Sequence, residues 1–164
     1  MSDGTPTPNL TTDPPGAAEP RRPRPVIHAH DRPFWTAGAL GELRMQHCGA
    51  CGRIVHPPAL RCPRDRSADL TWTTVTGRGT VEAWTVNLHQ WLPGFPAPYI
   101  VALVRIAEDP GARVLTNVIG IEPERMRDGL PVRVVFHHLE ASGPDEDDDV
   151  WLPLFEPDDE ATAR

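Results

Sequence analysis

The stretch HCGACGRIVHPPALRCPRDRSADL, residues 47–70, contains two short motifs of the kind that hold zinc in proteins. Cys48 and Cys51 are separated by two residues, and two thiolates at that spacing can converge on one ion. The second motif repeats the offset with Cys62 and Asp65, so an aspartate stands where a fourth cysteine is expected. The spacing therefore predicts a zinc ribbon with one substituted ligand.

The sequence leaves the fourth ligand open. Asp65 is a suitable candidate because carboxylate oxygen is an accepted zinc donor and keeps the charge of the thiolate that it replaces. His56, in the loop between the two motifs, is the alternative ligand. Two further alternatives are a site without metal, in which Asp65 caps a turn, and a catalytic zinc with an open position. We favour a filled structural site, because three clustered thiols without metal would be an exposed redox liability.

The acidic residues of the chain are concentrated near its C-terminus. The formal net charge is -7, but ten Asp and Glu against one Arg lie from Leu139 onward, which leaves 13 acidic and 15 basic residues in the rest. Such a near-neutral body lacks the clustered basic face by which nucleic acid is usually bound. We therefore expect no nucleic-acid partner and interpret the acidic segment as a solvated linker.

The cysteine count and the N-terminal sequence indicate a cytoplasmic protein. Three cysteines at ligand spacing are better explained as metal ligands in a reducing compartment than as disulfides. No apolar run is long enough to cross a bilayer, and residues 1–16 contain no hydrophobic region of a signal peptide. We accordingly expect no membrane partner.

The N-terminal part of the chain divides into an arm and a short helix. Residues 1–30 are rich in Pro, Thr and Asp with little apolar surface to bury, which predicts a disordered arm. A helix is expected to begin with Asp31 as its N-cap and to end before Gly41. Phe34 and Trp35 on this helix are expected mainly to pack, since aromatic side chains bring a large apolar area.

After the cysteine motifs, the hydrophobic pattern changes to a period of two residues. In residues 78–86 this pattern places Val81, Ala83 and Thr85 on one face of a strand. The alternation continues through residues 99–107, and the sequence of residues 108–111, Glu-Asp-Pro-Gly, predicts a type II turn. These strands therefore form a hairpin with the run that follows the turn.

The remaining elements complete a mostly β chain. We expect a short helix over residues 123–128, a strand over residues 131–139 and a last short edge segment in WLPLFEP, residues 151–157. Short strands of this number suggest a small closed OB-fold barrel behind the zinc ribbon. The expected divisions are an arm at 1–30, helix and ribbon at 31–70, barrel at 71–139, and an acidic tail at 140–164 with a packed segment at 150–156.

The combined pattern resembles the family known as domain of unknown function 35, in which a rubredoxin-like zinc ribbon is fused to an OB-fold and which is associated with acyl-CoA metabolism. The resemblance covers about residues 31–157. Asp65 departs from the family pattern, which usually has a fourth cysteine there, and this affects metal occupancy rather than the fold. The matching motifs are FW at 34–35, GEL at 41–43, CGACG at 48–52, HPP at 56–58, RCP at 61–63, TGRGTV at 76–81, PYIVALV at 98–104, GLPV at 129–132 and LPLF at 152–155.

The resemblance implies a role within a larger enzyme. Such proteins act as small partner subunits of thiolase-superfamily enzymes, among them acyltransferases and the aldolases that cleave steroid side chains as CoA thioesters. The partner carries the catalytic residues and binds most of the CoA thioester. We therefore expect a non-catalytic accessory subunit in a hetero-oligomer, required by an aldolase or acyltransferase complex, with structural zinc as its cofactor.

The residues themselves agree with the absence of a catalytic site. The chain has three Ser and no Lys, and its cysteines are already assigned to metal. His89, His137 and His138 are the groups that could be tested for catalysis, but no nucleophile or carboxylate stands at a useful spacing from them. We assign no catalytic residue.

The segment NLHQWLPGFPAPY, residues 87–99, is the best candidate for a partner-contacting loop. Its apolar side chains are unusual for a solvated loop, and its prolines would make ordering on binding inexpensive. A loop that folds back over the barrel end is the alternative, as is a stand-alone OB-fold that binds single-stranded nucleic acid through stacked aromatics. The predicted partner-binding residues are Phe34, Trp35, Trp91, Leu92, Phe95 and Tyr99.

Overall fold

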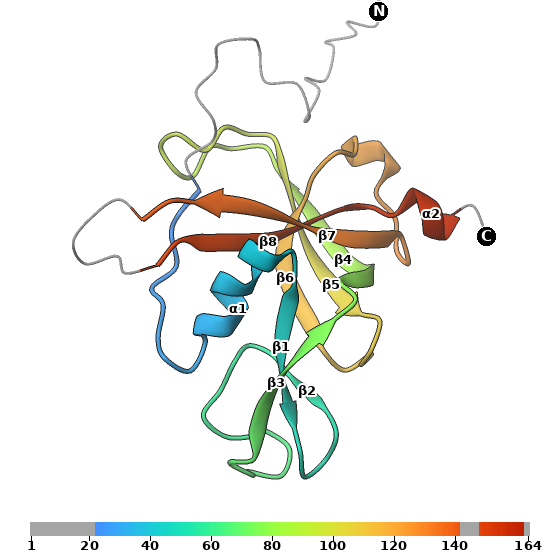
Figure 1. Cartoon of the computed structure of the whole chain (residues 1–164). Helices are drawn as coiled ribbons and strands as arrows, with labels where there is room; N and C mark the ends of the chain where they lie inside the picture. The colour runs from blue at the N-terminus through green and yellow to red at the C-terminus, as the bar shows by residue number, and fades with distance from the viewer. Residues whose placement is uncertain (1–21, 142–147, 163–164) are drawn as a thin grey trace, which may run out of the picture.

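The computed structural model describes residues 22–141 and 148–162 and shows a mostly β chain (Figure 1). A three-stranded sheet extends from one end of a barrel, with the first helix beside the junction. The expected ribbon and barrel are thus confirmed. The elements are α1 (Arg32–Thr36), η1 (Ala37–Leu40), β1 (Leu43–Cys48), β2 (Ile54–Val55), β3 (Leu70–Val75), β4 (Arg78–Asn87), β5 (Tyr99–Ile106), β6 (Arg113–Val118), η2 (Pro123–Arg125), β7 (Pro131–Leu139), β8 (Val150–Pro157) and α2 (Asp159–Thr162).

The predicted N-terminal helix is present, with Asp31 at its N-cap position, but only its first five residues are α-helical. It runs as α1 and then tightens into the 3-10 turn η1, which ends at Gly41 with φ 69°. Asp31 makes no side-chain cap bond to the helix, and its carboxylate instead accepts a hydrogen bond from the amide of His28 at 2.7 Å. Asp31 is therefore the N-cap residue, as expected, but its side chain does not cap the helix because the carboxylate is engaged by the preceding turn.

The ribbon sheet has the order β2-β1-β3. Strand β1 pairs with β3 over six positions, from Leu43 opposite Val75 to Cys48 opposite Leu70. Strand β3 was not anticipated, because LTWTTV shows no clean alternation of apolar and polar residues. Its pairing places the first cysteine motif at the end of a regular strand.

The barrel is closed in the order β4-β5-β6-β8-β7. Alternate residues of β5 point inward as predicted, namely Ile100, Ala102, Val104 and Ile106. The prediction for β4 is wrong beyond Val81, because a register shift between Val81 and Ala83 leaves Ala83 and Thr85 exposed.

Strand β8 is a wall of this barrel rather than an edge segment outside it. It pairs antiparallel with β7, from Val132 opposite Pro157 to Leu139 opposite Val150. It also meets β6 in parallel, where Val118 lies opposite Phe155. The segment that was expected to pack within the acidic tail is therefore part of the fold.

Two local expectations are corrected. Gly111 does not have the positive φ that a type II turn requires; the turn is closed by the amide of Ala112, which donates to the carbonyl of Asp109 at 2.8 Å. The helix expected over residues 123–128 is limited to the 3-10 turn η2, and Met126 is already extended.

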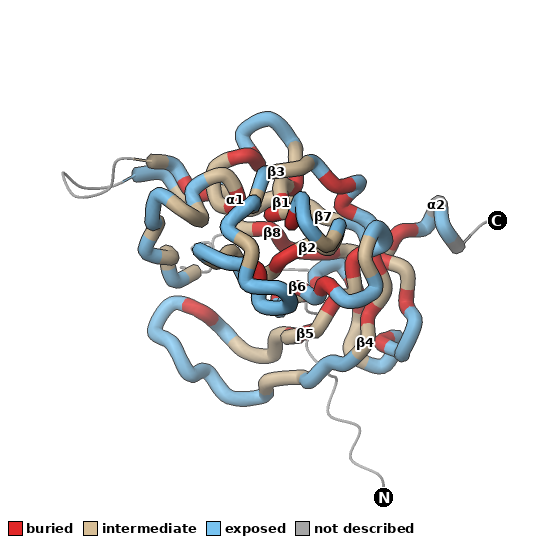
Figure 2. The backbone as a smooth tube through the Cα atoms, turned by 90° about the horizontal axis from the view of Figure 1, so that it is seen from below, coloured by how far each residue is buried: buried red, intermediate tan, exposed pale blue. Residues whose placement is uncertain are grey.

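One hydrophobic core serves both the ribbon and the barrel. Phe34, Leu43, Met45 and Val75 belong to the same buried cluster as the barrel residues, including Phe155. Figure 2 shows the buried segments gathered toward the middle, where β1, β7 and β8 meet, with exposed turns outside them. The helix and ribbon are therefore packed onto the barrel.

The predicted disordered arm falls partly outside the described residues, since residues 1–21 are not among them. Residues 22–30 form no helix or strand. They are nevertheless in contact with the barrel, because the guanidinium of Arg24 donates to the carbonyl of Leu139 at 3.1 Å and that of Arg22 donates to the side chain of Asn117. None of the helices among residues 22–141 and 148–162 has the length and apolar character needed to cross a membrane.

Candidate functional site

The structure brings the four predicted metal-binding residues together at the tip of the ribbon. One ligand atom each from Cys48, Cys51, Cys62 and Asp65 lies within 4.8 Å of the others. Cys48 ends β1, and its carbonyl accepts the amide of Gly52, which turns the chain so that Cys51 faces the same point. The predicted alternative ligand His56 is not part of this group.

The distances within this group fit a tetrahedral zinc ion. Bonds of about 2.3 Å to sulfur and about 2.1 Å to oxygen require separations of about 3.8 Å between two sulfurs and about 3.6 Å between sulfur and oxygen. The sulfurs of Cys51 and Cys62 are 3.7 Å apart, and Oδ2 of Asp65 is 3.6 Å from the sulfur of Cys48. Asp65 therefore stands where the fourth ligand of a zinc ribbon belongs.

The local backbone prepares Asp65 to act as an anionic ligand. The amide of Ser67 donates to its Oδ1 at 2.9 Å and lowers the pKa of the carboxyl. The amide of Arg53 also lowers the pKa of Cys51, but burial and the other three groups of the cluster outweigh it and raise that pKa to about 11. A cation held between the four groups would reverse this effect, because it favours the thiolate. The donor set thus suits a bound divalent ion.

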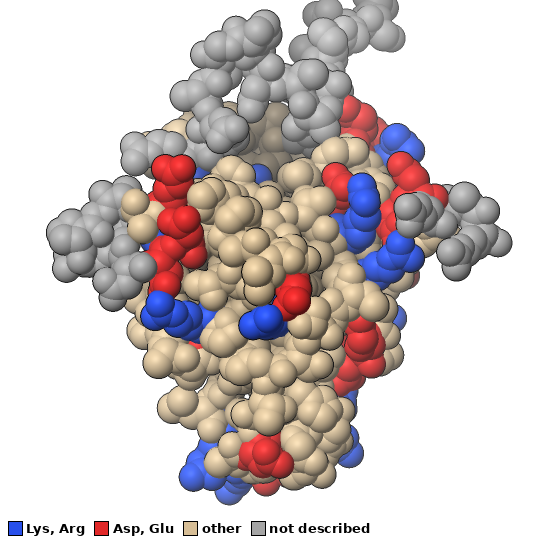
Figure 3. All heavy atoms as spheres, viewed as in Figure 1, with Lys and Arg blue, Asp and Glu red and all other residues tan. Residues whose placement is uncertain are grey.

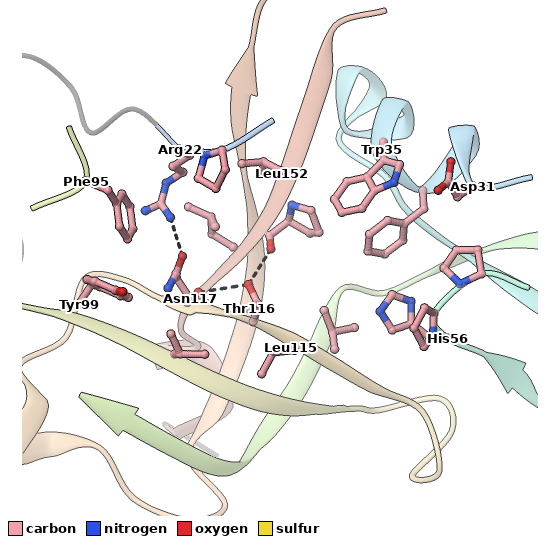
Figure 4. Close-up of a pocket in the computed structure, with 18 of the residues that line it drawn as sticks. Arg22, Asp31, Trp35, His56, Phe95, Tyr99, Leu115, Thr116, Asn117 and Leu152 are labelled. Atoms are coloured by element: carbon pink, nitrogen blue, oxygen red, sulfur yellow. Dashed lines mark hydrogen bonds between the residues drawn. The ribbon is translucent and has the colours of Figure 1, made fainter. Parts of the chain in front are cut away.

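A second feature is an apolar cleft of about 560 Å³ between β6 and β8 (Figure 4). Figure 4 shows Arg22, Phe95 and Tyr99 at one end, and Trp35, Asp31 and His56 at the other. The volume lies in the range of ordinary ligand and docking pockets. Its walls come from residues 114–117 of β6, residues 152–154 of β8, Tyr99 and Val101 of β5, the ribbon loop at 56–58, Phe34 and Trp35 of α1, the loop residues Leu92 and Phe95, Asp31, and the arm residues Arg22 and Pro23.

The cleft contains five of the six predicted partner-binding residues. Phe34 and Phe95 are buried in its walls, while Trp35 and Tyr99 are half-buried and Leu92 is exposed. Trp91 does not line the cleft; it lies on the adjoining loop with 68% of its surface exposed, in edge contact with His89 at 4.8 Å. The structure thus brings five of the predicted partner-binding residues together in one cleft. That these residues contact a partner stays a prediction.

The sequence predicted strands near residues 113–118 and 151–157, but it did not indicate that β6 and β8 contribute to a candidate binding site. Leu115 on β6 is 71% exposed although it is a leucine in the middle of a strand. Its position in the alternation RVLTNV places it on the outer face, so an apolar residue at an outward position was the available signal. The contribution of residues 152–154 could not be found, because it depends on the pairing of β8.

The polar groups of the cleft are mostly engaged. The hydroxyl of Thr116 donates to the carbonyl of Pro153 at 2.7 Å, and the guanidinium of Arg22 donates to Oδ1 of Asn117 at 2.6 Å. Nδ1 of His56 is buried without a hydrogen-bond partner among the described residues, and burial lowers the pKa of this imidazole to about 4. His56 is therefore neutral at pH 7 and extends the apolar wall next to Phe34, whose ring is 4.9 Å away.

The candidate histidines of β7 lie at the far end of the β7–β8 hairpin. His138 is hydrogen-bonded to Asp149 at 2.9 Å and stacks on Trp151 with ring centroids 4.2 Å apart. Arg24 and Arg32 of the N-terminal part donate to the backbone and side chain of Asp148 beside them. These contacts explain His138 as a group that joins the strands, and they tie the arm to the hairpin.

The face seen in Figure 3 is mostly uncharged, with one adjacent pair of basic and acidic groups near its middle and the other charged side chains toward its margins. Several barrel arginines are matched by carboxylates. Glu82 binds both Arg113, at 2.6 Å, and Arg105, at 3.5 Å, and Arg133 binds Glu156 at 2.7 Å. Paired arginines of this kind do not form the unneutralised basic groove that single-stranded nucleic acid would require.

Comparison with known proteins gives matches to both parts of the chain. A family model described as the ChsH2 rubredoxin-like zinc ribbon domain matches residues 35–71, and one described as the ChsH2 C-terminal OB-fold domain matches residues 72–137. The match to a zinc ribbon domain agrees with zinc as the expected cofactor. The four ligand atoms of Cys48, Cys51, Cys62 and Asp65 are positioned to bind a metal ion.

Similar proteins include subunits of CoA-thioester hydratases. The chain is 39% identical over 137 residues to a probable enoyl-CoA hydratase alpha subunit of Thermomonospora curvata, covering 83% of this chain and 40% of that subunit. It is 35% identical over 103 residues to the 3-oxo-4,17-pregnadiene-20-carboxyl-CoA hydratase alpha subunit of Mycobacterium tuberculosis, covering 63% of this chain and 32% of that one. The chain thus spans less than half the length of either relative.

A solved structure described as the Ltp2-ChsH2(DUF35) aldolase is similar over nearly the whole of its matching chain. The two chains share 38% identity with a TM-score of 0.63, and the match covers 82% of this chain and 98% of that chain.

Proposed function

Because the chain belongs to the DUF35 family, in which a rubredoxin-like zinc ribbon is joined to an OB-fold, we propose that it is a non-catalytic accessory subunit of an enzyme that acts on CoA thioesters. The partner that we assign is a thiolase-superfamily enzyme, and the reaction is the aldolase cleavage of a steroid side chain. The partner supplies the catalytic residues and binds most of the substrate. Acyl transfer is the second reaction that such a complex could perform.

The observation that carries this proposal is the match to the DUF35 chain of the Ltp2-ChsH2 aldolase, which this chain covers almost completely. The hydratase alpha subunits support the assignment to CoA-thioester enzymes, and the second of them adds a steroid substrate. The cleft supplies the physical means, because an exposed apolar surface beside buried aromatic residues is typical of a protein interface. Zinc bound by Cys51 and Cys62 would hold the ribbon loop between them, which forms one wall of that cleft.

The experiment is to tag the chain in its own host, purify it gently, and identify by mass spectrometry the proteins that co-elute in stoichiometric amount. Metal is assayed in the same sample. A thiolase-like partner with about one zinc per chain, as one four-ligand site requires, supports the proposal. A chain that elutes alone or with nucleic acid contradicts it.

Two variants locate the interface. Leu92→Asp places a charge in the cleft and should reduce the co-purified partner, because desolvating an unpaired carboxylate at an interface is costly. Leu40→Asp is the matched control, since Leu40 is also exposed but does not line the cleft. Equal loss with both variants, or no loss with either, would remove the cleft from the interface.

A further inference from the structure

The barrel wall between β6 and β8 is open over most of its length. Strand β6 is paired along its whole length with β5, from Ile100 opposite Val118 to Arg105 opposite Arg113. Its other side meets β8 at Val118 and Phe155, and no further pairing of that side occurs within residues 22–141 and 148–162. The cleft occupies the space where the pairing would otherwise continue.

The register fixes where the main-chain groups of Leu115 point. The amide of Ile106 donates to the carbonyl of Ala112 at 3.1 Å, and antiparallel ladders alternate between bonded and non-bonded pairs. The pair formed by Leu103 and Leu115 lies three residues along the ladder from the bonded pair of Ile106 and Ala112, so it is a non-bonded pair. The N–H and C=O of Leu115 therefore face away from β5, toward β8 and the cleft.

Strand β8 does not complete the wall opposite Leu115. Pro153 has no N–H to donate. Its carbonyl is already used by the hydroxyl of Thr116, at 2.7 Å. The parallel ladder begins farther on, where the amide of Ile119 donates to the carbonyl of Phe155 at 2.8 Å. Among the described residues, no strand is registered opposite the main-chain donor and acceptor of Leu115, which lie beside the apolar cleft.

We propose that the β6 edge at Leu115 binds an extended segment of the partner protein as an added strand. The inference rests on the proposed function, since it names how the partner is held. An extended polypeptide is favoured because its backbone supplies both an acceptor and a donor at the spacing of β6. A helix has no free main-chain groups along its middle, and a small apolar ligand would leave those of Leu115 unpaired.

The surroundings define the segment that fits. The edge from Arg113 to Asn117 spans five residues, roughly 16 Å in extended conformation, so a short strand of similar length can lie along it. Apolar side chains at alternate positions of that strand would enter the cleft, and the others would cover Leu115. Arg113 is neutralised by Glu82 at one end, so the centre favours uncharged residues.

The first test is amide hydrogen exchange on the purified, zinc-loaded chain. Because the amide of Leu115 faces the cleft while that of Thr116 faces β5, we expect Leu115 to exchange about a hundredfold faster than Thr116. Adding the co-purified partner should slow exchange at Leu115 to the level of Thr116. Equal protection of the two amides in the isolated chain would overturn the inference.

The second test compares Leu115→Pro with Leu115→Ala. Proline removes the donor that faces the cleft without removing a β5 bond, whereas alanine keeps the donor and shortens the side chain. We expect partner affinity to fall about tenfold more for proline than for alanine, with both variants retaining the far-UV circular dichroism and zinc content of the parent chain. Equal affinities would overturn the inference.

The outcomes distinguish strand addition at β6 from the proposed accessory-subunit function. If a thiolase-like partner binds but the exchange of Leu115 does not change, strand addition is wrong and the accessory function stands. If no protein partner is isolated, both are wrong.

Discussion

Lowering the pH from 7 to 5 should destabilise the chain through His56. Burial lowers the pKa of this imidazole from 6.5 to about 4. At a pH between these two pKa values, the folded chain therefore binds fewer protons at His56 than the unfolded chain does. The resulting stability is fully present above pH 6.5 and is lost as the pH falls toward 4.

The magnitude follows from the two pKa values. Their difference corresponds to about 3 kcal/mol in total, and roughly 2 kcal/mol of this is lost between pH 7 and 5. Asp31 is the carboxylate at the same end of the cleft, and it is already engaged with the amide of His28. It does not provide a ready counter-ion for a protonated ring.

The assay is urea unfolding at pH 7 and pH 5 with zinc in excess, on the parent chain and on His56→Phe. Phenylalanine keeps an aromatic ring against Phe34 and cannot take up a proton. Protonation of the zinc ligands affects both proteins alike, so the difference between their losses isolates His56. We expect the parent chain to lose roughly 2 kcal/mol more than the variant. Identical losses would show that His56 is not held neutral by burial, and the description of the cleft wall would be refuted.

Three further predictions concern the metal site, the barrel seam and the helix contact. Asp65→Ala should weaken zinc binding about tenfold or more while Asp65→Cys retains it, as measured by competition with a chromophoric chelator; unchanged affinity in the alanine variant would exclude Asp65 as a ligand. Thr116→Val removes the donor to Pro153 and should lower the free energy of unfolding by about 1–2 kcal/mol in urea, whereas a neutral effect would mean that the seam does not depend on this bond. Gly38→Ala should cost about 1–3 kcal/mol, because a Cβ there would lie 2.4 Å from that of Trp151, and a melting temperature equal to that of the parent would contradict the close packing of η1 on β8.

The parts of the fold that follow from local sequence were predictable. The offset of Cys48 and Cys51 places two ligands by the geometry of one turn, and the second motif does the same at Cys62 and Asp65. The inward face of β5 follows from a period of two that no bulge interrupts. In β4 the same reasoning fails at the bulge, which the sequence does not mark.

The cleft could be predicted only in part, because its walls come from distant segments. The apolar loop and the aromatic residues of α1 were recognisable by composition. Their meeting with residues 114–117 and 152–154 depends on the pairing of β6 with β8, which lie far apart in the chain. Residues 151–157 were predicted as an edge segment, but β8 pairs with β7 along its length and forms a wall of the barrel.

The shared core has a consequence for how such chains evolve. The two family models meet between residues 71 and 72, within strand β3, although that strand is paired with β1 along its length. Asp109 of the barrel also binds the amide of Ile54 in the ribbon at 3.0 Å. Recombination at this joint would separate Leu43 and Met45 from the core that they complete. Ribbon and barrel are thus expected to be inherited and transplanted as a single unit, and a chimaera that exchanges one of them must carry matching residues on both sides of the contact.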